Sequence, residues 1–150
     1  GYTKSTAEAY GRYLEHGGKS YVQRKKLDPF ELVQKIIEYG GVPVLAHPKS
    51  LRFSEDVAEE FIGKLVESGL CGIEVYNSNI GENKRAWYLE LCNKNNLIPT
   101  VGSDYHGGKR KPVLEIGKGK NDNLNVSDMS IIERLKKKKQ EIDELNSKNQ

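Results

Sequence analysis

Two hydrophobic patterns alternate along the chain. One places apolar residues three or four positions apart, as in a helix with a buried face, and the other is a short run of continuous apolar residues. These patterns predict helices over residues 29–39, 54–68 and 82–93, and strands over 42–46, 72–76 and 97–101. Such alternation predicts parallel strands joined by right-handed crossovers. Because the runs are almost entirely apolar, we expect helices on one face of the sheet and a barrel interior or second helical layer on the other.

Local signals support these element limits. Asp28 followed by Pro29, with Glu31 three residues on, is typical of a helix start, and Gly40 and Gly69 stand where two of the helices should end. A further strand is predicted over 113–116, a final helix from Ser127 or Asp128, a first helix over 6–14 and an extended stretch over 20–23.

Charge and hydropathy exclude several classes of function. The 150 residues carry 24 basic and 21 acidic side chains, a balance too even to indicate a dedicated nucleic-acid binder. No apolar run is long enough to span a bilayer, so no membrane partner is expected. Lysines 136–139 lie in a stretch that also holds Glu133, Glu141, Asp143 and Glu144, which favours a solvated helix face over a binding surface.

The two cysteines indicate a reducing environment. Cys71 and Cys92 each follow a leucine and form no Cys-x-x-Cys motif. Buried reduced thiols are therefore expected rather than a disulfide or a metal site. This favours a cytoplasmic location.

Candidate chemistry lies where the predicted strands end. The first strand ends at His47, and the third leads into Asp104 and His106. The carboxyl ends of parallel strands share one edge, so these side chains should lie together. Asp104 and His106 are two positions apart and would leave an extended segment on the same side, while Pro48 should hold His47 extended. Imidazole and carboxylate groups so placed can bind a divalent metal, the alternative being a hydrogen-bonded His–Asp pair in a loop.

Other polar residues have two interpretations each. Glu74, in an apolar strand, needs either an ion-pair partner or a role in the site. Tyr76 and Asn77 could bind substrate or bond their own backbone. Arg24 is a candidate phosphate contact, although a surface salt bridge is the commoner role. Ser103 lacks the Gly-x-Ser-x-Gly setting of a nucleophile.

Three segments resemble the later motifs of the polymerase and histidinol phosphatase (PHP) domain family. They are Gly40-Gly-Val-Pro-Val-Leu-Ala-His47-Pro48, Gly69-Leu-Cys-Gly-Ile-Glu74-Val-Tyr76 and Gly102-Ser-Asp104-Tyr-His106-Gly107. The segment Ala7-Glu-Ala-Tyr-Gly-Arg-Tyr-Leu14 with Tyr21-Val22 resembles the region that precedes them. The similarity covers residues 5–120 and is strongest to small metal-dependent phosphoesterases that act on nucleotides or short RNA ends.

The resemblance implies a distorted (β/α)7 barrel with two or three Mn, Zn, Fe or Mg ions at its mouth. By the same resemblance, His47, Asp104 and His106 would be metal ligands, with Asp104 and His106 central to catalysis. The ions would activate water and neutralise phosphate charge. Lys109 and Arg110 follow the ligand loop and are candidate phosphate contacts, although solvated loop charges are the commoner role for such residues.

The family opens with a His-x-His motif, whereas this chain has three histidines and no such motif. We therefore interpret residues 1–126 as the C-terminal portion of the barrel and 127–150 as a helix with a lysine-rich, solvated end. A start at Gly1 instead of Met agrees with an excised segment. Such a portion should bind metal weakly, show little activity alone and expose apolar faces that invite homo-oligomerisation. The alternatives are a phosphatase of a small metabolite such as histidinol phosphate and a non-catalytic structural or regulatory domain.

Overall fold

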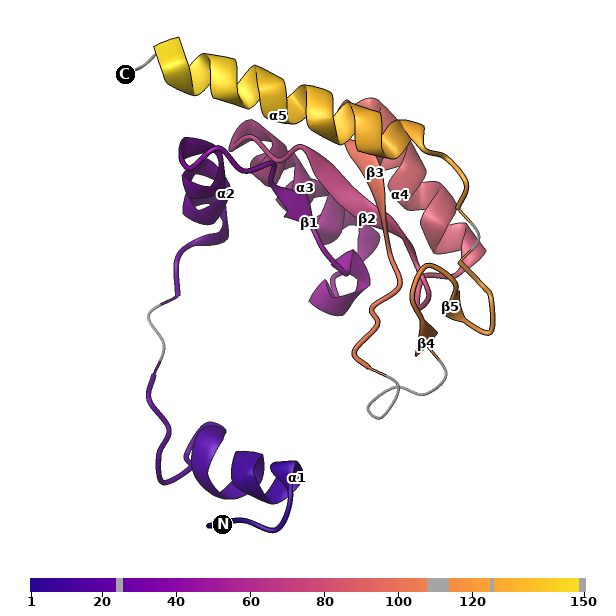
Figure 1. Ribbon diagram of the computed structural model, residues 1–150. Helices are drawn as coiled ribbons and strands as arrows, with labels where there is room; N and C mark the ends of the chain where they lie inside the picture. Colours follow the sequence, from indigo (N-terminus) through magenta and orange to yellow (C-terminus); the bar gives the residue numbers. More distant parts are fainter. Residues whose placement is uncertain (24–25, 108–113, 125, 149–150) are drawn as a thin grey trace.

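The centre of the molecule is a three-stranded parallel sheet in the order β1-β2-β3 (Figure 1). The computed structural model describes residues 1–23, 26–107, 114–124 and 126–148. The strands are β1 (Val44–Leu45), β2 (Gly72–Asn77) and β3 (Ile98–Gly102). Val44 pairs with Gly72, and Asn77 pairs with Gly102. This registry brings the carboxyl ends of the strands to one edge.

Three helices form the main core with the sheet: α2 (Pro29–Glu38), α3 (Glu55–Glu67) and α4 (Glu82–Lys94). Ile73 and Val75 of β2 are fully buried and pack with Ile62 of α3 and Leu91 of α4. Each helix begins close to its predicted start. The Asp28 side chain accepts hydrogen bonds from the backbone N–H groups at the start of α2, as its sequence position predicted.

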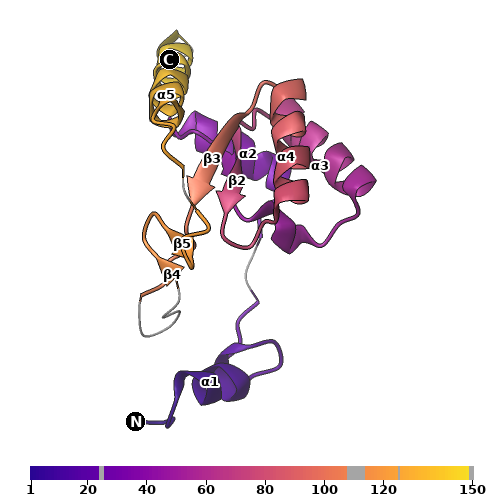
Figure 2. The ribbon, with the colours of Figure 1, turned by 90° about the vertical axis from the view of Figure 1, so that its right-hand side faces the viewer.

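The last helix, α5 (Ser130–Lys148), lies on the other side of the sheet from α3 and α4 (Figure 2). The Arg134 guanidinium donates to the carbonyl of Leu97, just before β3, and the Asn146 amide donates to the carbonyl of Ile37 near the end of α2. Through these two hydrogen bonds, α5 links the start of β3 to the end of α2, at the edge of the sheet opposite the strand ends. Several of its lysines pair with acids on the same helix: Lys136 with Glu133, Lys138 with Glu141 and Lys139 with Asp143.

Two other parts complete the described structure. Helices α1 (Thr6–Ala9) and η1 (Tyr10–Leu14) lie apart from the sheet in both ribbon views (Figures 1 and 2). Strands β4 (Leu114–Glu115) and β5 (Gly119–Lys120) form a separate antiparallel hairpin.

The structure confirms the predicted α/β class with parallel strands and covering helices. Three details differ. The first strand is only two residues long, and the final helix begins at Ser130, with the Asp128 carboxylate accepting from the Ser130 N–H. The strand predicted over 113–116 does not extend the parallel sheet, because Leu114 and Glu115 pair with the chain that turns back immediately after them. No helix in the described part of the chain has the length and apolar character to cross a membrane.

Both cysteines are free, as predicted. Cys92 is buried, and burial raises the pKa of its thiol to about 11. Burial also raises the pKa of the half-buried Cys71 thiol. Neither thiol is activated for nucleophilic chemistry.

We expect Ile73→Ala to lower the free energy of unfolding by about 2–5 kcal/mol, because it leaves a cavity between β2 and its helices. Urea unfolding followed by circular dichroism measures the change. Ile116→Ala is the matched control, since Ile116 is 74% exposed, and it should change stability by no more than about 0.5 kcal/mol. Equal effects of the two substitutions would contradict the assigned core.

We expect Cys92 in the folded protein to react with iodoacetamide at pH 8 about 100-fold more slowly than in urea, because its thiolate is rarer in the fold. Peptide mapping by mass spectrometry measures the rate at each cysteine. The raised pKa also makes stability depend on pH. Cys92 contributes to the free energy of unfolding below pH 9, and this contribution is lost as the pH rises toward about 11. Similar rates in folded and unfolded protein would refute the burial of Cys92.

Candidate functional site

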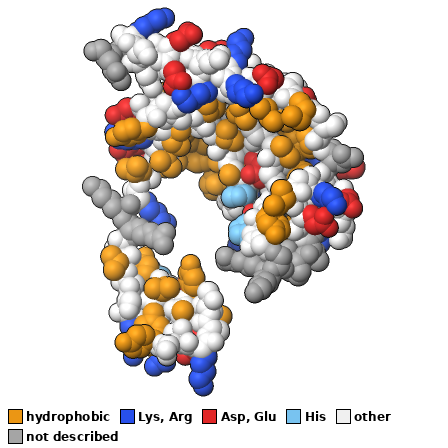
Figure 3. All heavy atoms as spheres, viewed as in Figure 1, with side chains coloured by type: hydrophobic (Ala, Val, Ile, Leu, Met, Phe, Trp, Pro, Cys, Tyr) orange, Lys and Arg blue, Asp and Glu red, His pale blue; other side chains and the backbone are white. Residues whose placement is uncertain are grey.

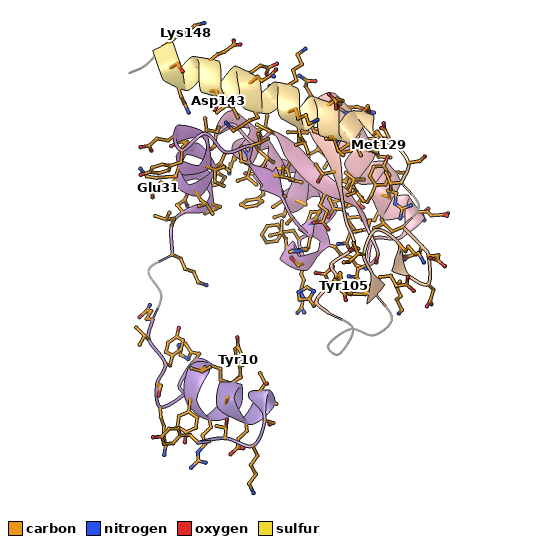
Figure 4. The ribbon with its side chains drawn as sticks, in the orientation of Figure 1. Tyr10, Glu31, Tyr105, Met129, Asp143 and Lys148 are labelled. Atoms are coloured by element: carbon orange, nitrogen blue, oxygen red, sulfur yellow. The ribbon has the colours of Figure 1, made fainter. Side chains whose placement is uncertain are left out.

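Residues from all three strand ends line one cavity of about 350 Å³ at the carboxyl edge of the sheet. Its lining comprises His47, Lys49, Ser50, Asn77, Asn79, Ile80 and Asp104. Figure 3 shows histidine side chains on this hollowed side of the molecule, beside a band of hydrophobic side chains. Figure 4 places Tyr105 in the loop after β3, on the side of the molecule that carries the turn following β1. The predicted meeting of strand ends is therefore present.

His47 reaches the cavity through a conformation that the sequence did not indicate. It was expected to be extended because Pro48 follows it, but its backbone is left-handed, with φ 40° and ψ 55°. Proline disfavours the right-handed helical region for the residue before it and leaves other turns open. Here the carbonyl of His47 accepts from both the N–H and the hydroxyl of Ser50, each at 2.8 Å. These bonds begin the short helix η2 (Pro48–Leu51) and turn the imidazole toward the site.

Asp104 and His106 also come together by a turn and not by extended alternation. Asp104 has φ 55°, and the Nδ1 atom of His106 lies 2.6 Å from the carbonyl oxygen of Asp104. A carbonyl only accepts, so Nδ1 is the donor of this bond, and in the neutral ring Nε2 is then the nitrogen that can bind a metal. The same Nδ1 lies 3.6 Å from Oδ1 of Asp104, and Nε2 of His47 lies 3.9 Å from that carboxylate oxygen.

These distances fit part of a metal site. A nitrogen and an oxygen that each lie about 2.1 Å from one ion are at most about 4.2 Å apart, so His47 and Asp104 can share an ion. His106 adds a free Nε2 beside them. Within the described residues, however, no group of three or more His, Cys, Asp or Glu side chains is arranged to hold an ion. The donor chemistry suits a divalent cation, but the described ligand set is incomplete.

Glu74 has a polar partner behind the cavity. Its neighbours Ile73 and Val75 are fully buried, whereas the Glu74 carboxylate accepts a hydrogen bond from the side-chain amide of Asn77. The carboxylate also lies against Gly102, where an added Cβ would come within 2.9–3.1 Å of its atoms. The bare Cα of Gly102 therefore makes room for Glu74, and Glu74 in turn orients Asn77.

The remaining predicted site residues divide into two groups. Asn77 lines the cavity, whereas Tyr76 does not, and its ring packs on the core with the Arg85 guanidinium 5.8 Å from its centre. Arg24, Lys109 and Arg110 lie outside the described residues. His16, which the sequence did not connect with the site, is exposed, and its ring lies 5.1 Å from that of Tyr21 in a tilted arrangement.

Sequence reasoning missed Lys49, Ser50, Asn79 and Ile80 as cavity residues. One signal was available: the Asn-x-Asn spacing of residues 77 and 79 is typical of a turn in which an Asn side chain caps a nearby N–H. The N–H of Asn79 indeed donates to Oδ1 of Asn77 at 2.9 Å. The contact between Lys49 and Asn79, thirty positions apart, has no comparable local signal.

Comparisons with known proteins support a resemblance to phosphoesterases. No family model matches the chain. It is 34% identical over 98 residues to a phosphoribosyl 1,2-cyclic phosphate 1,2-diphosphodiesterase of Eggerthella lenta, which covers 65% of this chain and 36% of the relative. It is 26% identical over 118 residues to the 5′-3′ exoribonuclease Rnm of Escherichia coli, covering 79% of this chain and 40% of the relative. The chain thus spans well under half the length of these relatives.

Solved structures show the same fold. A protein from Bifidobacterium adolescentis assigned as a metal-dependent phosphoesterase superposes with a TM-score of 0.62 at 24% identity, over 89% of this chain and 44% of that one. An amidohydrolase from Chromobacterium violaceum gives a TM-score of 0.54 at 23% identity, over 89% of this chain and 46% of that one. The resemblance to part of a larger PHP-type phosphoesterase, and its α/β fold, are confirmed by these similarities.

We expect Gly102→Ala to displace the Glu74 carboxylate and disturb its bond to Asn77, while unfolding free energy changes by no more than about 1 kcal/mol. The displaced atoms are the end of a flexible side chain, so the fold can adjust. The side-chain amide resonances of Asn77 in a ¹H–¹⁵N spectrum measure the effect. Gly63→Ala is the control, because an added Cβ there meets no neighbour within 4 Å. Unshifted Asn77 resonances in Gly102→Ala would refute the contact.

Proposed function

We propose that this chain is part of a metal-dependent phosphoesterase that hydrolyses ribose phosphodiesters in nucleotides or short RNA. The observation that carries the proposal is the meeting of His47 and Asp104, from two different strand ends, at one cavity. The names of the two relatives share one chemistry, a phosphodiester attached to ribose. A cytoplasmic location is part of the proposal, because the free thiols suit a reducing compartment.

His47, Asp104 and His106 would contribute to holding the metal, together with ligands beyond the described residues. A divalent ion bound there would supply an activated water and positive charge beside a phosphoryl group. The hydrogen bond from Nδ1 of His106 to the Asp104 carbonyl fixes the ring and leaves Nε2 as its acceptor. Asp104, with a side chain only 15% exposed, contributes the charged oxygen. Asn77 would orient substrate from the end of β2.

A small phosphoribosyl ester is the second candidate substrate, because the relative with 34% identity is named for such a compound. This candidate gives a specific substrate class to the alternative of a small-metabolite phosphatase. Phosphate contacts by Arg24, Lys109 and Arg110 and substrate binding by Tyr76 stay predictions, as do the number and identity of the metal ions and homo-oligomerisation. The competing hypothesis is that the protein has a non-catalytic structural or regulatory role.

We expect Asp104→Ala and His106→Ala each to lower turnover more than about 100-fold, because each removes a metal-binding group. The assay uses the product of the complete open reading frame that encodes these residues, with Mn²⁺, a 5′-phosphorylated oligoribonucleotide and a cyclic phosphoribosyl diester. His16→Ala is the matched control and should retain activity, since His16 lies on the exposed N-terminal segment. Unchanged turnover in both site variants would refute the assignment. Absence of turnover on every phosphodiester in the unmodified protein would favour the non-catalytic role.

A further inference from the structure

We infer that Lys49 is the anion-binding residue of the cavity beside His47 and Asp104, and that it contacts the phosphate of the substrate. This inference rests on the proposed phosphoesterase function and names a residue for its substrate. Lys49 comes two positions after His47, on the short helix η2, and its side chain lines the cavity.

The ammonium group of Lys49 has a neutral partner. Its Nζ donates to the backbone carbonyl of Asn79 at 2.7 Å. Many other lysines in the described part of the chain pair with a carboxylate, such as Lys64 with Glu60 at 2.6 Å and Lys84 with Glu55 at 3.0 Å. No carboxylate in the described residues forms an ion pair with Lys49. Its positive charge therefore reaches the cavity without a paired acid, and an ammonium has two further N–H donors to offer.

The carbonyl that holds Lys49 is itself fixed. The Asn79 N–H donates to the side chain of Asn77, whose amide donates to Glu74. The backbone of Ser78 is held from the other side, since the Asn123 amide donates to its carbonyl at 2.8 Å. A lysine side chain loses rotational freedom about several bonds when it binds a ligand. Because the hydrogen bond to Asn79 already holds Lys49 in place, less entropy is lost on binding, and the affinity for an anion is higher.

The composition of the cavity fits a phosphate ester. His47 and Asp104 form the side on which a metal would bind, while Lys49, Ser50 and Asn77 supply an ammonium, a hydroxyl and an amide. Donors of these kinds bind phosphate oxygens. The volume of about 350 Å³ is within the range of small-molecule sites and has room for more than a phosphate alone.

The test is the affinity of the 150-residue chain for inorganic phosphate and for a nucleoside 5′-monophosphate, with Mg²⁺ present, followed by ¹H–¹⁵N spectra. We expect Lys49→Met to weaken both affinities about tenfold or more, because a charge-assisted hydrogen bond is lost. Lys49→Arg keeps the charge and should restore most of the affinity, whereas Lys49→Gln keeps a donor for the Asn79 carbonyl without the charge and should not restore it. Lys64→Met removes an equal charge from the outer face of α3 and should leave binding unchanged.

In the complete protein, Lys49→Met should raise the KM for a phosphodiester about tenfold with a smaller change in kcat. Equal phosphate affinity for Lys49→Met and Lys64→Met would overturn the inference, as would an unchanged KM in an active enzyme, and the proposed function would stand in both cases. Phosphate binding that depends on Lys49 in a protein without phosphodiester turnover would support the anion site and refute the proposed function. If Lys49→Met fails to fold, loss of binding in Lys49→Gln with native circular dichroism supports the inference, and retained binding overturns it.

Discussion

The pairing of β2 with both of its neighbours is the constraint on which the candidate site depends. Ile73 and Val75 bury one face of β2 against the helices, so the alternate side chain, Glu74, is directed to the other face. Pairing of Asn77 with Gly102 then makes β2 and β3 end together, while β1 ends earlier, at Leu45 opposite Ile73, and the chain continues from it to His47. A shift of β2 by one residue would bury Glu74 and expose its apolar neighbours. The packing of the core therefore also sets the positions of the site residues.

Both residues that carry the central side chains of the site have a strained backbone, as do four other non-glycine residues among those described. His47 and Asp104 both have positive φ angles, although neither is glycine. A left-handed conformation costs an L-residue about 1–2 kcal/mol, and it persists where neighbouring bonds determine it. For His47 those bonds come from Ser50, and for Asp104 the partner is the ring of His106. Such strain is typical of positions where side-chain direction matters more than local stability.

Much of the fold could be predicted because its signals are local. The Asp28 cap, the helix stops and the apolar runs each depend on a few neighbouring residues. Because the predicted strands are parallel, their carboxyl ends share one edge, and the sequence therefore predicts that His47 and Asp104 lie at the same edge. The turn conformations of those two residues could not be predicted, because bonds to Ser50 and His106 select them against ordinary preference. The hairpin of Leu114 and Glu115 and the contact from Lys49 to Asn79 depend on how separate segments pack. These contacts form only when the separate segments have packed together in the folded protein.

The balance of charges in the cavity explains why a metal and a phosphate would bind there together. Asp104 alone would repel a phosphate, and Lys49 alone would weaken the binding of a cation nearby. In the proposed function, a divalent ion held by Asp104 and the histidines would reverse the local charge, and Lys49 would then bind the phosphate. Only two of the three strand ends supply metal-binding side chains, since β2 ends in an amide at Asn77. A stable cluster of ions therefore needs ligands beyond those in the described residues, and metal affinity and phosphate affinity should rise together when those ligands are supplied.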